Sequence, residues 1–227
     1  MNFPELHRWD MTPKAAIALQ KQLAKRIRLD CRLTQPVRYV AGVDVSYRRG
    51  GNDFFAAVVV LKLPELKLEE QVTASGRVTF PYVPGLLSFR ELPVVLQAFG
   101  KLHAVPDAVL VDGQGIAHPR RFGIASHLGL WLDLPTVGCA KSRLCGEHDL
   151  PGRHRGDQVP LVLESEPVGT VLTTRDNIKP LYVSPGHLLD VPTAAELVMR
   201  CLGRCRLPEP TRLAHLLANE ARRNAKH

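Results

Sequence analysis

The sequence predicts an α/β protein whose central mixed β-sheet is flanked by helices. Three β-rich runs follow one another near the N-terminus, and the Gly-Gly-Asn-Asp segment at 50–53 between the first two is typical of a hairpin loop. Farther along, short apolar strands alternate with helical stretches, as in βαβ units. An antiparallel start followed by parallel units makes the sheet mixed. No repeat, low-complexity tract or long linker divides the chain, so we expect residues 1–227 to form a single domain.

The first half of the chain predicts two helices and three strands. Thr12 and Pro13 are typical of a helix N-cap and first helical position, and apolar residues at helical spacing extend this helix to about Leu29. A proline-bracketed loop over 80–85 separates the last of the three strands from the second helix. The expected ranges are 37–47, 54–63 and 67–74 for the strands and about 88–102 for the second helix.

The second half alternates strands and helices around a polar surface loop, which we expect over residues 146–158. Short apolar runs predict the strands, and apolar residues every three or four positions predict the helices. The expected strands are 108–112, 136–140, 159–164, 169–174 and 181–183, and the expected helices are 119–130, 193–202 and 211–222.

Composition argues against several classes of protein. The 30 Lys and Arg residues exceed the 22 Asp and Glu residues by a formal charge of +8, which favours polyanionic partners such as nucleic acid. The longest apolar run, residues 54–61, is far shorter than the roughly 20 residues of a membrane span, and the polar start is unlike a secretory signal. Five cysteines without a Cys-x-x-Cys pair argue against a disulfide scaffold or a zinc ribbon. We therefore expect a soluble, cytoplasmic protein with no membrane partner.

Asp44 lies in the middle of an otherwise apolar strand, Val-Ala-Gly-Val-Asp-Val-Ser over 40–46. Strand alternation places it on the same face as Gly42 and Ser46. A buried carboxylate is costly unless a partner or a metal ion compensates its charge. Asp44 is therefore either a sheet-edge residue bonded to a nearby loop or part of a functional site.

Asp112 ends the apolar strand that begins at Ala108 and precedes a Gly-Gln-Gly segment over 113–115. Ligands of open α/β sheets lie beyond the carboxyl ends of strands, where this pattern places Asp112. The segment lacks the third glycine of a dinucleotide-binding fingerprint, and an Asx-turn is the structural alternative. Together with Asp44, Asp112 would form an oxygen-rich site for Mg²⁺ or Mn²⁺.

Two short motifs have a structural as well as a functional interpretation. The Ser-x-x-Glu segment over 88–91 matches a capping box, in which Glu91 would only close the N-terminus of a helix. The His-Pro-Arg-Arg segment over 118–121 predicts a helix that opens at Pro119 and binds phosphate at its N-terminus. A solvated basic turn is the alternative for the second motif.

Isolated basic and aromatic residues add further candidates. Lys141, just after an expected strand, could reach a phosphate or be solvated, and His215 could face a site or solvent. Tyr82 lies in a loop that Pro81 and Pro84 stiffen. Proteins that open a duplex often insert such an aromatic ring between base steps as a wedge. The alternatives are that the ring packs on the core or that the loop binds a protein partner. Basic residues near the C-terminus could contact phosphates, namely Arg200, Arg204, Arg206, Arg212, Arg222, Arg223 and Lys226.

Taken together, five segments resemble the endonuclease V family. They lie at 40–46, 81–91, 111–127, 135–146 and 206–212, and the longest reads Val-Asp-Gly-Gln-Gly-Ile-Ala-His-Pro-Arg-Arg-Phe-Gly-Ile-Ala-Ser-His. The resemblance implies a ribonuclease H-like fold and Mg²⁺-dependent DNA repair, with Mn²⁺ expected to substitute. It implies cleavage of the second phosphodiester bond 3′ to deoxyinosine, the product of adenine deamination, leaving 3′-hydroxyl and 5′-phosphate ends.

The resemblance also assigns roles by position. Asp44 and Asp112 match the metal-binding aspartates, and Glu91 matches the third acidic residue, which favours catalysis over a plain helix cap. The other matches to active-site residues are His118, Lys141 and His215.

Further positions match the substrate-binding segments of the family. Tyr82 matches the tip of the wedge. The other expected substrate-binding residues, which include those around the pocket for the flipped base, are Pro81, Gly85, Leu87, Gly113, Arg120, Gly123 and Ile124. We expect the partner to be double- or single-stranded DNA containing deoxyinosine, bound by a monomer. Inosine-containing RNA is an alternative substrate, and a basic nucleic-acid-binding protein without catalysis is an alternative of another class.

Overall fold

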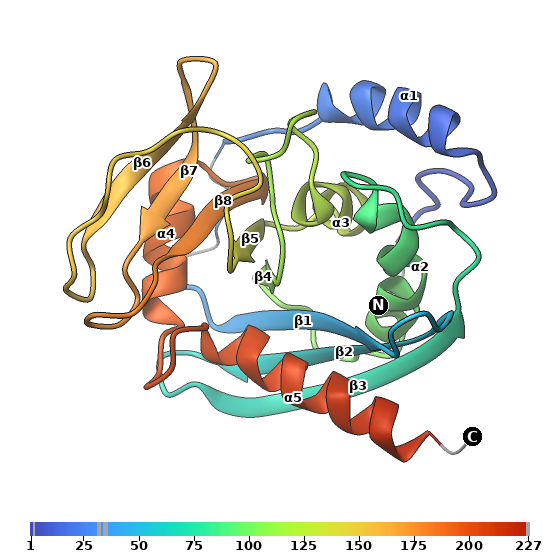
Figure 1. The fold of residues 1–227 in the computed structure, drawn as a ribbon. Coiled ribbons are helices and arrows are strands. Elements are labelled where there is room, and N and C mark those ends of the chain that lie inside the picture. The colour runs from blue at the N-terminus through green and yellow to red at the C-terminus, as the bar shows by residue number, and fades with distance from the viewer. Residues whose placement is uncertain (2, 31–32, 34–35, 226–227) are drawn as a thin grey trace.

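Eight strands form one mixed sheet in the order β3-β2-β1-β4-β5-β8-β7-β6 (Figure 1). The computed structural model describes residues 1, 3–30, 33 and 36–225. β1, β4 and β5 run parallel, and every other neighbouring pair of strands is antiparallel, which confirms the predicted mixed sheet. The strands are β1 (Tyr39–Tyr47), β2 (Asp53–Lys62), β3 (Lys67–Arg77), β4 (Ala108–Val111), β5 (Thr136–Ala140), β6 (Gln158–Leu163), β7 (Glu166–Leu172) and β8 (Leu181–His187).

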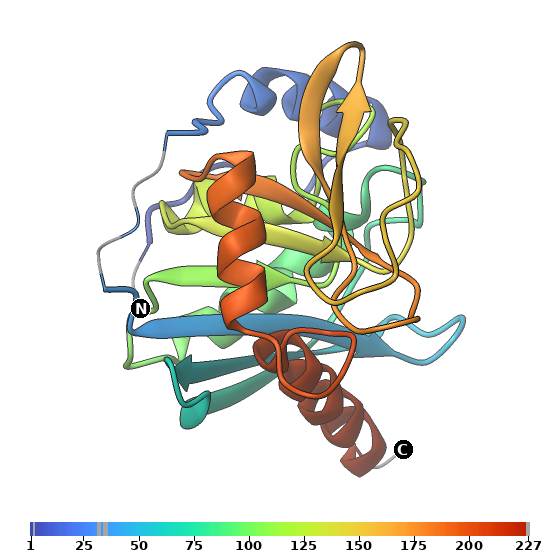
Figure 2. The same cartoon turned by 90° about the vertical axis from the view of Figure 1, so that its left-hand side faces the viewer.

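Four helices cover the two faces of the sheet. α2 (Leu87–Gly100) and α3 (Ile124–Leu132) pack on one face, where their apolar residues form one core cluster with β1, β2 and β4. α4 (Val191–Arg200) and α5 (Glu209–Asn224) pack on the other face, as the view in Figure 2 shows. The remaining helix, α1 (Pro13–Ala24), lies outside these layers against the loop before α2.

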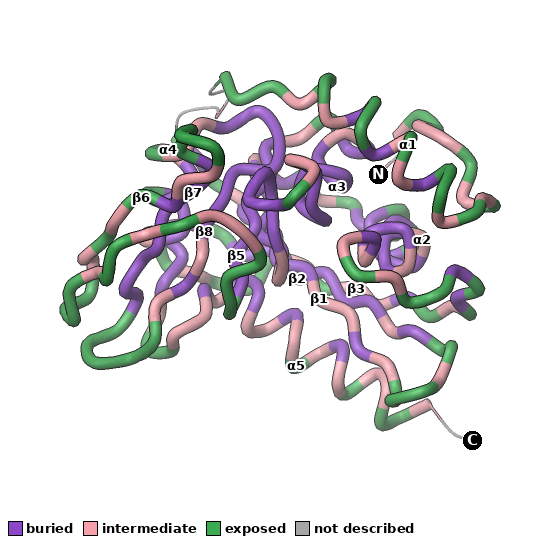
Figure 3. The backbone as a smooth tube through the Cα atoms, turned by 45° about the horizontal axis from the view of Figure 1, so that its top comes forward, coloured by how far each residue is buried: buried purple, intermediate pink, exposed green. Residues whose placement is uncertain are grey.

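The central strands are buried on both faces, because a helix covers each side. In β1, Ala41 and Val43 join the cluster under α2 and α3, whereas Val40 joins the cluster under α4. Figure 3 shows this buried centre, surrounded by exposed segments in the β6–β7 hairpin and on the outer side of α1. The strand alternation predicted for β1 is therefore the observed one, and it directs Gly42 and Asp44 toward α5.

β4 is much shorter than its neighbour β1, and this difference opens the sheet at one point. Val43 of β1 pairs with Val111, the last residue of β4, but β1 continues as far as Tyr47. Beyond Val43, β1 has a paired strand only on the β2 side within the described part of the chain. Asp44 and Asp112 are the first residues past this point, and both border the gap.

Two predicted helices have different ends in the structure. α1 ends at Ala24 rather than near Leu29, because the chain turns to β8, where the Arg28 amide bonds His187 and its carbonyl accepts from Leu188. The helix predicted to open at Pro119 instead begins at Ile124, so that prediction was wrong.

The late start of α3 has a conformational cause. The amide of Arg121 closes a tight turn onto the carbonyl of His118, and Arg121 has a left-handed φ of 54°. A residue in that conformation cannot lie inside a right-handed helix.

No helix in the described ranges is long and apolar enough to cross a membrane.

Gly42 allows α5 to approach β1 closely enough to reach Asp44. A Cβ atom at this position would lie 2.0 Å from the carbonyl carbon of Pro210, in the first turn of α5. The obstacle is backbone, so a larger residue could be accommodated only if α5 moved away from the sheet.

We expect Gly42→Ala to destabilise the protein by about 2 kcal/mol, which lowers the Tm by about 4–8 °C for a chain of this size. Gly100→Ala is the matched control, because nothing lies within 4 Å of a Cβ atom at the end of α2. Thermal unfolding of both variants measures the difference. Equal melting temperatures would show that α5 does not depend on this close approach.

Candidate active site

Three carboxylates meet where β4 ends. Asp44 comes from β1, Asp112 follows β4, and Glu91 comes from the sheet-facing side of α2. All three border one small cavity of about 10 Å³, whose other lining side chains are apolar. A space of this size holds about one water molecule or a small ion. The three carboxylates can come together because of the gap beside β1. Through this gap, Glu91 reaches the site from one face of the sheet, and the side chain of Asp44 reaches it from the other face.

Burial and mutual repulsion disfavour the charged forms of two of these carboxylates. Burial, reinforced by the nearby Asp44 and Asp112 carboxylates, raises the pKa of Glu91 to about 8. Burial and the proximity of Asp112 also raise the pKa of Asp44, against the opposing effect of its hydrogen bond to His215. Such a cluster is costly to bury unless a cation compensates it.

A chain of hydrogen bonds from α5 orients Asp44. The Ser46 hydroxyl donates to Asn219 Oδ1, and Asn219 Nδ2 donates to His215 Nε2 at 3.1 Å. His215 Nδ1 then donates to Asp44 Oδ2 at 2.7 Å. The structure therefore places His215 against the Asp44 carboxylate, with 45% of its side chain still exposed.

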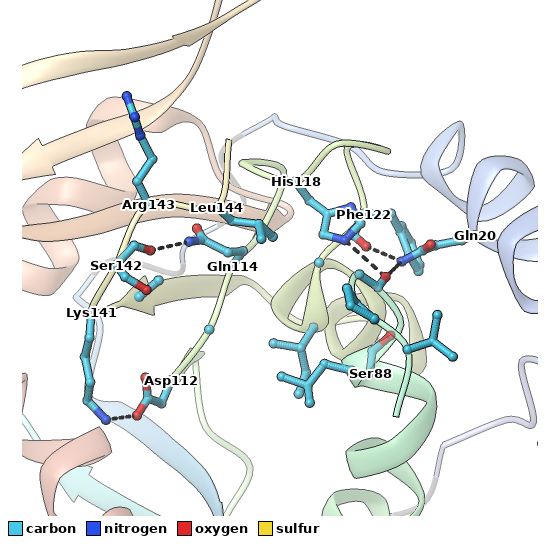
Figure 4. A pocket seen from close by; sticks show the side chains of 18 of the residues that line it. Gln20, Ser88, Asp112, Gln114, His118, Phe122, Lys141, Ser142, Arg143 and Leu144 are labelled. Carbon is cyan, nitrogen blue, oxygen red and sulfur yellow. Dashed lines mark hydrogen bonds and ion pairs between the residues drawn. The ribbon is translucent and has the colours of Figure 1, made fainter. Parts of the chain in front are cut away.

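Lys141 occupies the other side of the site. It follows β5, the strand next to β4, and its ammonium group pairs with Asp112 Oδ2 (Figure 4). Because the carboxyl ends of parallel strands lie at one edge of a sheet, β1, β4 and β5 bring Asp44, Asp112 and Lys141 together.

The donor set fits Mg²⁺ or Mn²⁺ by its chemistry. Hard divalent cations prefer carboxylate oxygens, and Asp44, Glu91 and Asp112 supply these oxygens around one cavity. As their side chains are placed, however, no group of three or more His, Cys, Asp or Glu side chains among the described residues is arranged to hold a metal ion. His215 and Lys141 engage two of the three carboxylates instead.

A second, larger cavity begins at Asp112. Its volume is about 410 Å³, within the usual range for a pocket that holds a small molecule or a base. Asp112 and Lys141 lie at one end, and His118, Phe122 and Gln20 lie at the other (Figure 4). The expected substrate-binding residues that line it are Tyr82, Gly85, Leu87, Gly113, Gly123 and Ile124, whereas Pro81 and Arg120 are not in its lining.

Tyr82 lies in a loop that is anchored at both ends. Before it, Phe80 is buried against Phe89, and its carbonyl accepts a hydrogen bond from Arg90. After it, Pro84 and Gly85 form a tight turn in which Gly85 has a φ of 78°, a conformation that favours glycine. Tyr82 itself is 67% exposed, so the interpretation of this ring as packed on the core was wrong.

Gln20 of α1 ties this loop to the opposite wall of the larger cavity. Its Nε2 donates to the carbonyls of Gly85 and Phe122, at 3.0 and 2.8 Å, and its Oε1 accepts from Arg120 Nε. The sequence analysis missed Gln20. A polar residue on the buried stripe formed by Ala16 and Leu23 was the available signal, because such a residue needs buried hydrogen-bond partners.

His118 is a neutral part of the same network. Burial, together with the charge of Arg120, lowers the pKa of His118 to about 4. The Arg120 amide donates to Nδ1, so Nε2 carries the proton and donates to the Gly85 carbonyl at 3.2 Å. His118 therefore supports the wall of the larger cavity, and it does not line the small cavity between the carboxylates.

The structure corrects the interpretation of both short motifs. Because α3 begins at Ile124, no helix N-terminus lies at Pro119 to bind phosphate. Arg120 donates to the Gly85 carbonyl, and Arg121 pairs with Glu164 and Glu166, so both guanidinium groups have protein partners.

The capping-box interpretation was also wrong. Leu86 is the N-cap residue of α2, without a side-chain hydrogen bond, and Ser88 lies inside the helix, where it bonds His127 Nδ1. Glu91 is thereby available to the carboxylate site.

We expect Gln20→Ala to loosen the walls of the larger cavity, because it leaves the Phe122 carbonyl without its donor and removes one of the three donors to the Gly85 carbonyl, at a cost of about 1–3 kcal/mol. Hydrogen–deuterium exchange should become faster over residues 80–87 and 118–123. Gln22→Ala, on the exposed side of α1, is the control. If both variants exchange as the unchanged protein does, the contacts of Gln20 do not hold these loops.

Comparison with known proteins shows the family of the chain. The sequence model of the family described as Endonuclease V matches residues 21–216. Endonuclease V from Nostoc punctiforme is 48% identical over 219 residues, which cover 96% of this chain and 99% of that protein.

Solved structures agree with the sequence comparison. The crystal structure of endonuclease V from Streptomyces avermitilis has a TM-score of 0.90 and 42% identity, covering 96% of each chain. Endonuclease V from Ciona intestinalis, solved in complex with a 24mer DNA containing an inosine followed by a ribo-adenosine, has a TM-score of 0.82 and 26% identity, covering 94% of this chain and 98% of that one. These likenesses confirm the ribonuclease H-like fold, and the chain belongs to the endonuclease V family.

Proposed function

We propose that the protein is a Mg²⁺-dependent repair endonuclease that recognises deoxyinosine in DNA. The observation that carries the proposal is the shared border of the two cavities at Asp112. One cavity is lined by three carboxylates and the other is large enough for a base. An enzyme that binds a damaged base in one cavity and cuts the nucleic-acid backbone in a neighbouring cavity needs two adjoining cavities of this kind.

Asp44, Glu91 and Asp112 are the residues that would hold the metal ion. When bound, a divalent cation supplies positive charge that activates a water molecule and stabilises the attacking and leaving oxygens. His215 fixes the orientation of the Asp44 carboxylate, and the ammonium group of Lys141 lies where it can attract a phosphate oxygen of the incoming strand. Mn²⁺ should substitute, since it accepts the same oxygen ligands.

The larger cavity would receive the base after it leaves the stack. Hypoxanthine differs from adenine in its 6-oxo group and its protonated N1, which backbone N–H and C=O groups can distinguish. The segments around Gly85, Gly113 and Gly123 line the cavity, and their backbone would be the source of such groups. Tyr82, exposed at the rim, would enter the gap that the base leaves in the duplex.

The separation of the two cavities supports cleavage away from the damaged nucleotide. With the base held between Gln20 and Asp112, the carboxylates act on a phosphate farther along the strand, in our proposal the second bond 3′ to the lesion. Hydrolysis there would leave 3′-hydroxyl and 5′-phosphate ends. RNA containing inosine is the second candidate substrate, since the DNA bound by the Ciona intestinalis relative carries a ribonucleotide after its inosine.

We expect Asp44→Asn and Asp112→Asn to lower the nicking rate by at least about 10²–10³-fold, because each removes a charge that the reaction centre uses. The assay maps nicks in a labelled duplex with one deoxyinosine, with Mg²⁺ and with a chelator. Asp53→Asn, at an exposed position, is the control, and circular dichroism checks that each variant is folded. A variant that still nicks at the original rate would reject the assignment of the carboxylates.

We expect Tyr82→Ala to reduce the preference for deoxyinosine over undamaged DNA by about tenfold, since stacking of one base on a ring contributes about 1–3 kcal/mol. Tyr82→Phe keeps the ring and should keep most of the preference. The measurement is kcat/KM on matched duplexes with and without deoxyinosine. An unchanged preference in Tyr82→Ala would exclude a wedge at this position.

A further inference from the structure

A second open cleft adjoins the base-sized cavity on the side of Lys141. Its volume is about 580 Å³, and the two hollows share Lys141, Ser142 and Arg143. In Figure 4, Lys141 points toward Asp112 whereas Arg143 points away from it, and Arg143 lines both hollows. The cleft therefore begins where the carboxylate site ends.

The lining of the cleft is strongly cationic. No Asp or Glu side chain is among its lining residues in the described part of the chain. Its basic side chains are Lys141, Arg143, His148, Arg153, Lys179 and Arg206.

Several hydrogen bonds hold the walls of the cleft together. The guanidinium group of Arg206 donates to the carbonyls of Lys141 and Pro180, at 2.9 and 2.7 Å, and so joins two walls. Asn177 donates from its amide to the carbonyl of Arg153, which joins two loops. Hydrogen bonds therefore fix the shape of the cleft, whose walls come from segments that are far apart in the sequence.

The outer cations of the cleft lack carboxylate partners. Within the described ranges, no Asp or Glu oxygen lies at ion-pair distance from Arg143, Arg153 or Lys179. Two nearby acids, Asp157 and Asp176, accept hydrogen bonds from backbone amides of residues 154 and 155. The positive field of the cleft is therefore available to an anionic ligand.

Apolar side chains in the same cleft indicate what kind of anion it fits. Leu150 is 90% exposed and Ile178 is 42% exposed, and both line the cleft. Tyr182 presents a ring there, and its hydroxyl lies 3.3 Å from His148 Nε2. Grooves that bind nucleic-acid strands combine cations for the phosphates with apolar or aromatic surfaces for the bases.

We propose that this cleft binds the phosphodiester backbone of the strand to be cut, on the flank that leaves the carboxylate site past Lys141. The proposal rests on the proposed function, which brings the strand to Asp112. It adds a binding surface several residues wide that contacts the nucleic acid away from both the damaged base and the reacting bond. Such contacts raise affinity through the release of counterions, without reading sequence.

The test compares two double variants with the same change in charge. Arg153→Ala/Lys179→Ala removes two cations of the cleft, whereas Lys62→Ala/Lys67→Ala removes two exposed cations from the β2–β3 turn. Binding of a labelled single strand containing deoxyinosine is measured in EDTA over a range of salt concentrations. We expect the slope of log K against log salt to fall by about 1.4 in the cleft variant and to stay unchanged in the control. Equal slopes in the two variants would overturn the proposal.

Nicking of substrates of different length gives a second readout. With long substrates, we expect the cleft variant to lose about tenfold in kcat/KM while kcat at saturation is retained. The loss should disappear once the strand is trimmed on one flank, and trimming from the 5′ and 3′ ends separately identifies that flank. A loss that persists on the shortest cleaved substrate would contradict a role in flank binding. Failure of the unchanged protein to nick deoxyinosine would instead reject the proposed function, while the binding experiment would still test the cleft.

Discussion

The early end of β4 is the constraint on which the candidate site depends. β4 stops at Val111 while β1 runs on to Tyr47, so the sheet opens beside Asp44. Through this gap, α2 brings Glu91 from one face of the sheet, and α5 brings His215 from the other. A longer β4 would fill the gap with a paired strand and keep these side chains apart. The carboxylate cluster is thus a consequence of strand length, and Gly42 supplies the close approach of α5 that completes it.

The base-sized cavity depends on a different kind of constraint, a set of hydrogen bonds to backbone carbonyls. Gln20, His118 and Arg120 all bond the Gly85 carbonyl, which closes the turn behind Tyr82. This network joins α1, the loop before α2 and the turn before α3 around one polar atom. Because two of its donors, Gln20 and His118, are buried, its geometry resists deformation, while Tyr82 remains exposed at the rim.

Charge is distributed to match these constraints. Three carboxyl side chains gather in the small cavity, and cations line the cleft beyond Lys141. Lys141 lies at the boundary, paired with Asp112. Several basic residues that appear free in the sequence have structural partners instead: Arg212 pairs with Glu209, and Arg222 bonds the carbonyl of Tyr47. Lys226 lies outside the described residues.

The sequence by itself determined the mixed sheet, the order of the elements and the positions of Asp44 and Asp112, because these follow from periodicity and from strand ends. The family resemblance already assigned Glu91 and His215 to the site, but only the tertiary structure shows what Glu91, His215 and Gln20 contact. Taken alone, their local patterns match a helix cap, a solvated helix face and an ordinary α1 residue, and contacts with residues far away in the sequence overrule those patterns. The start of α3 was mispredicted for a related reason: Pro119 is typical of a first helical turn, but the left-handed Arg121 and the ion pairs of its side chain with Glu164 and Glu166 hold a turn in that place.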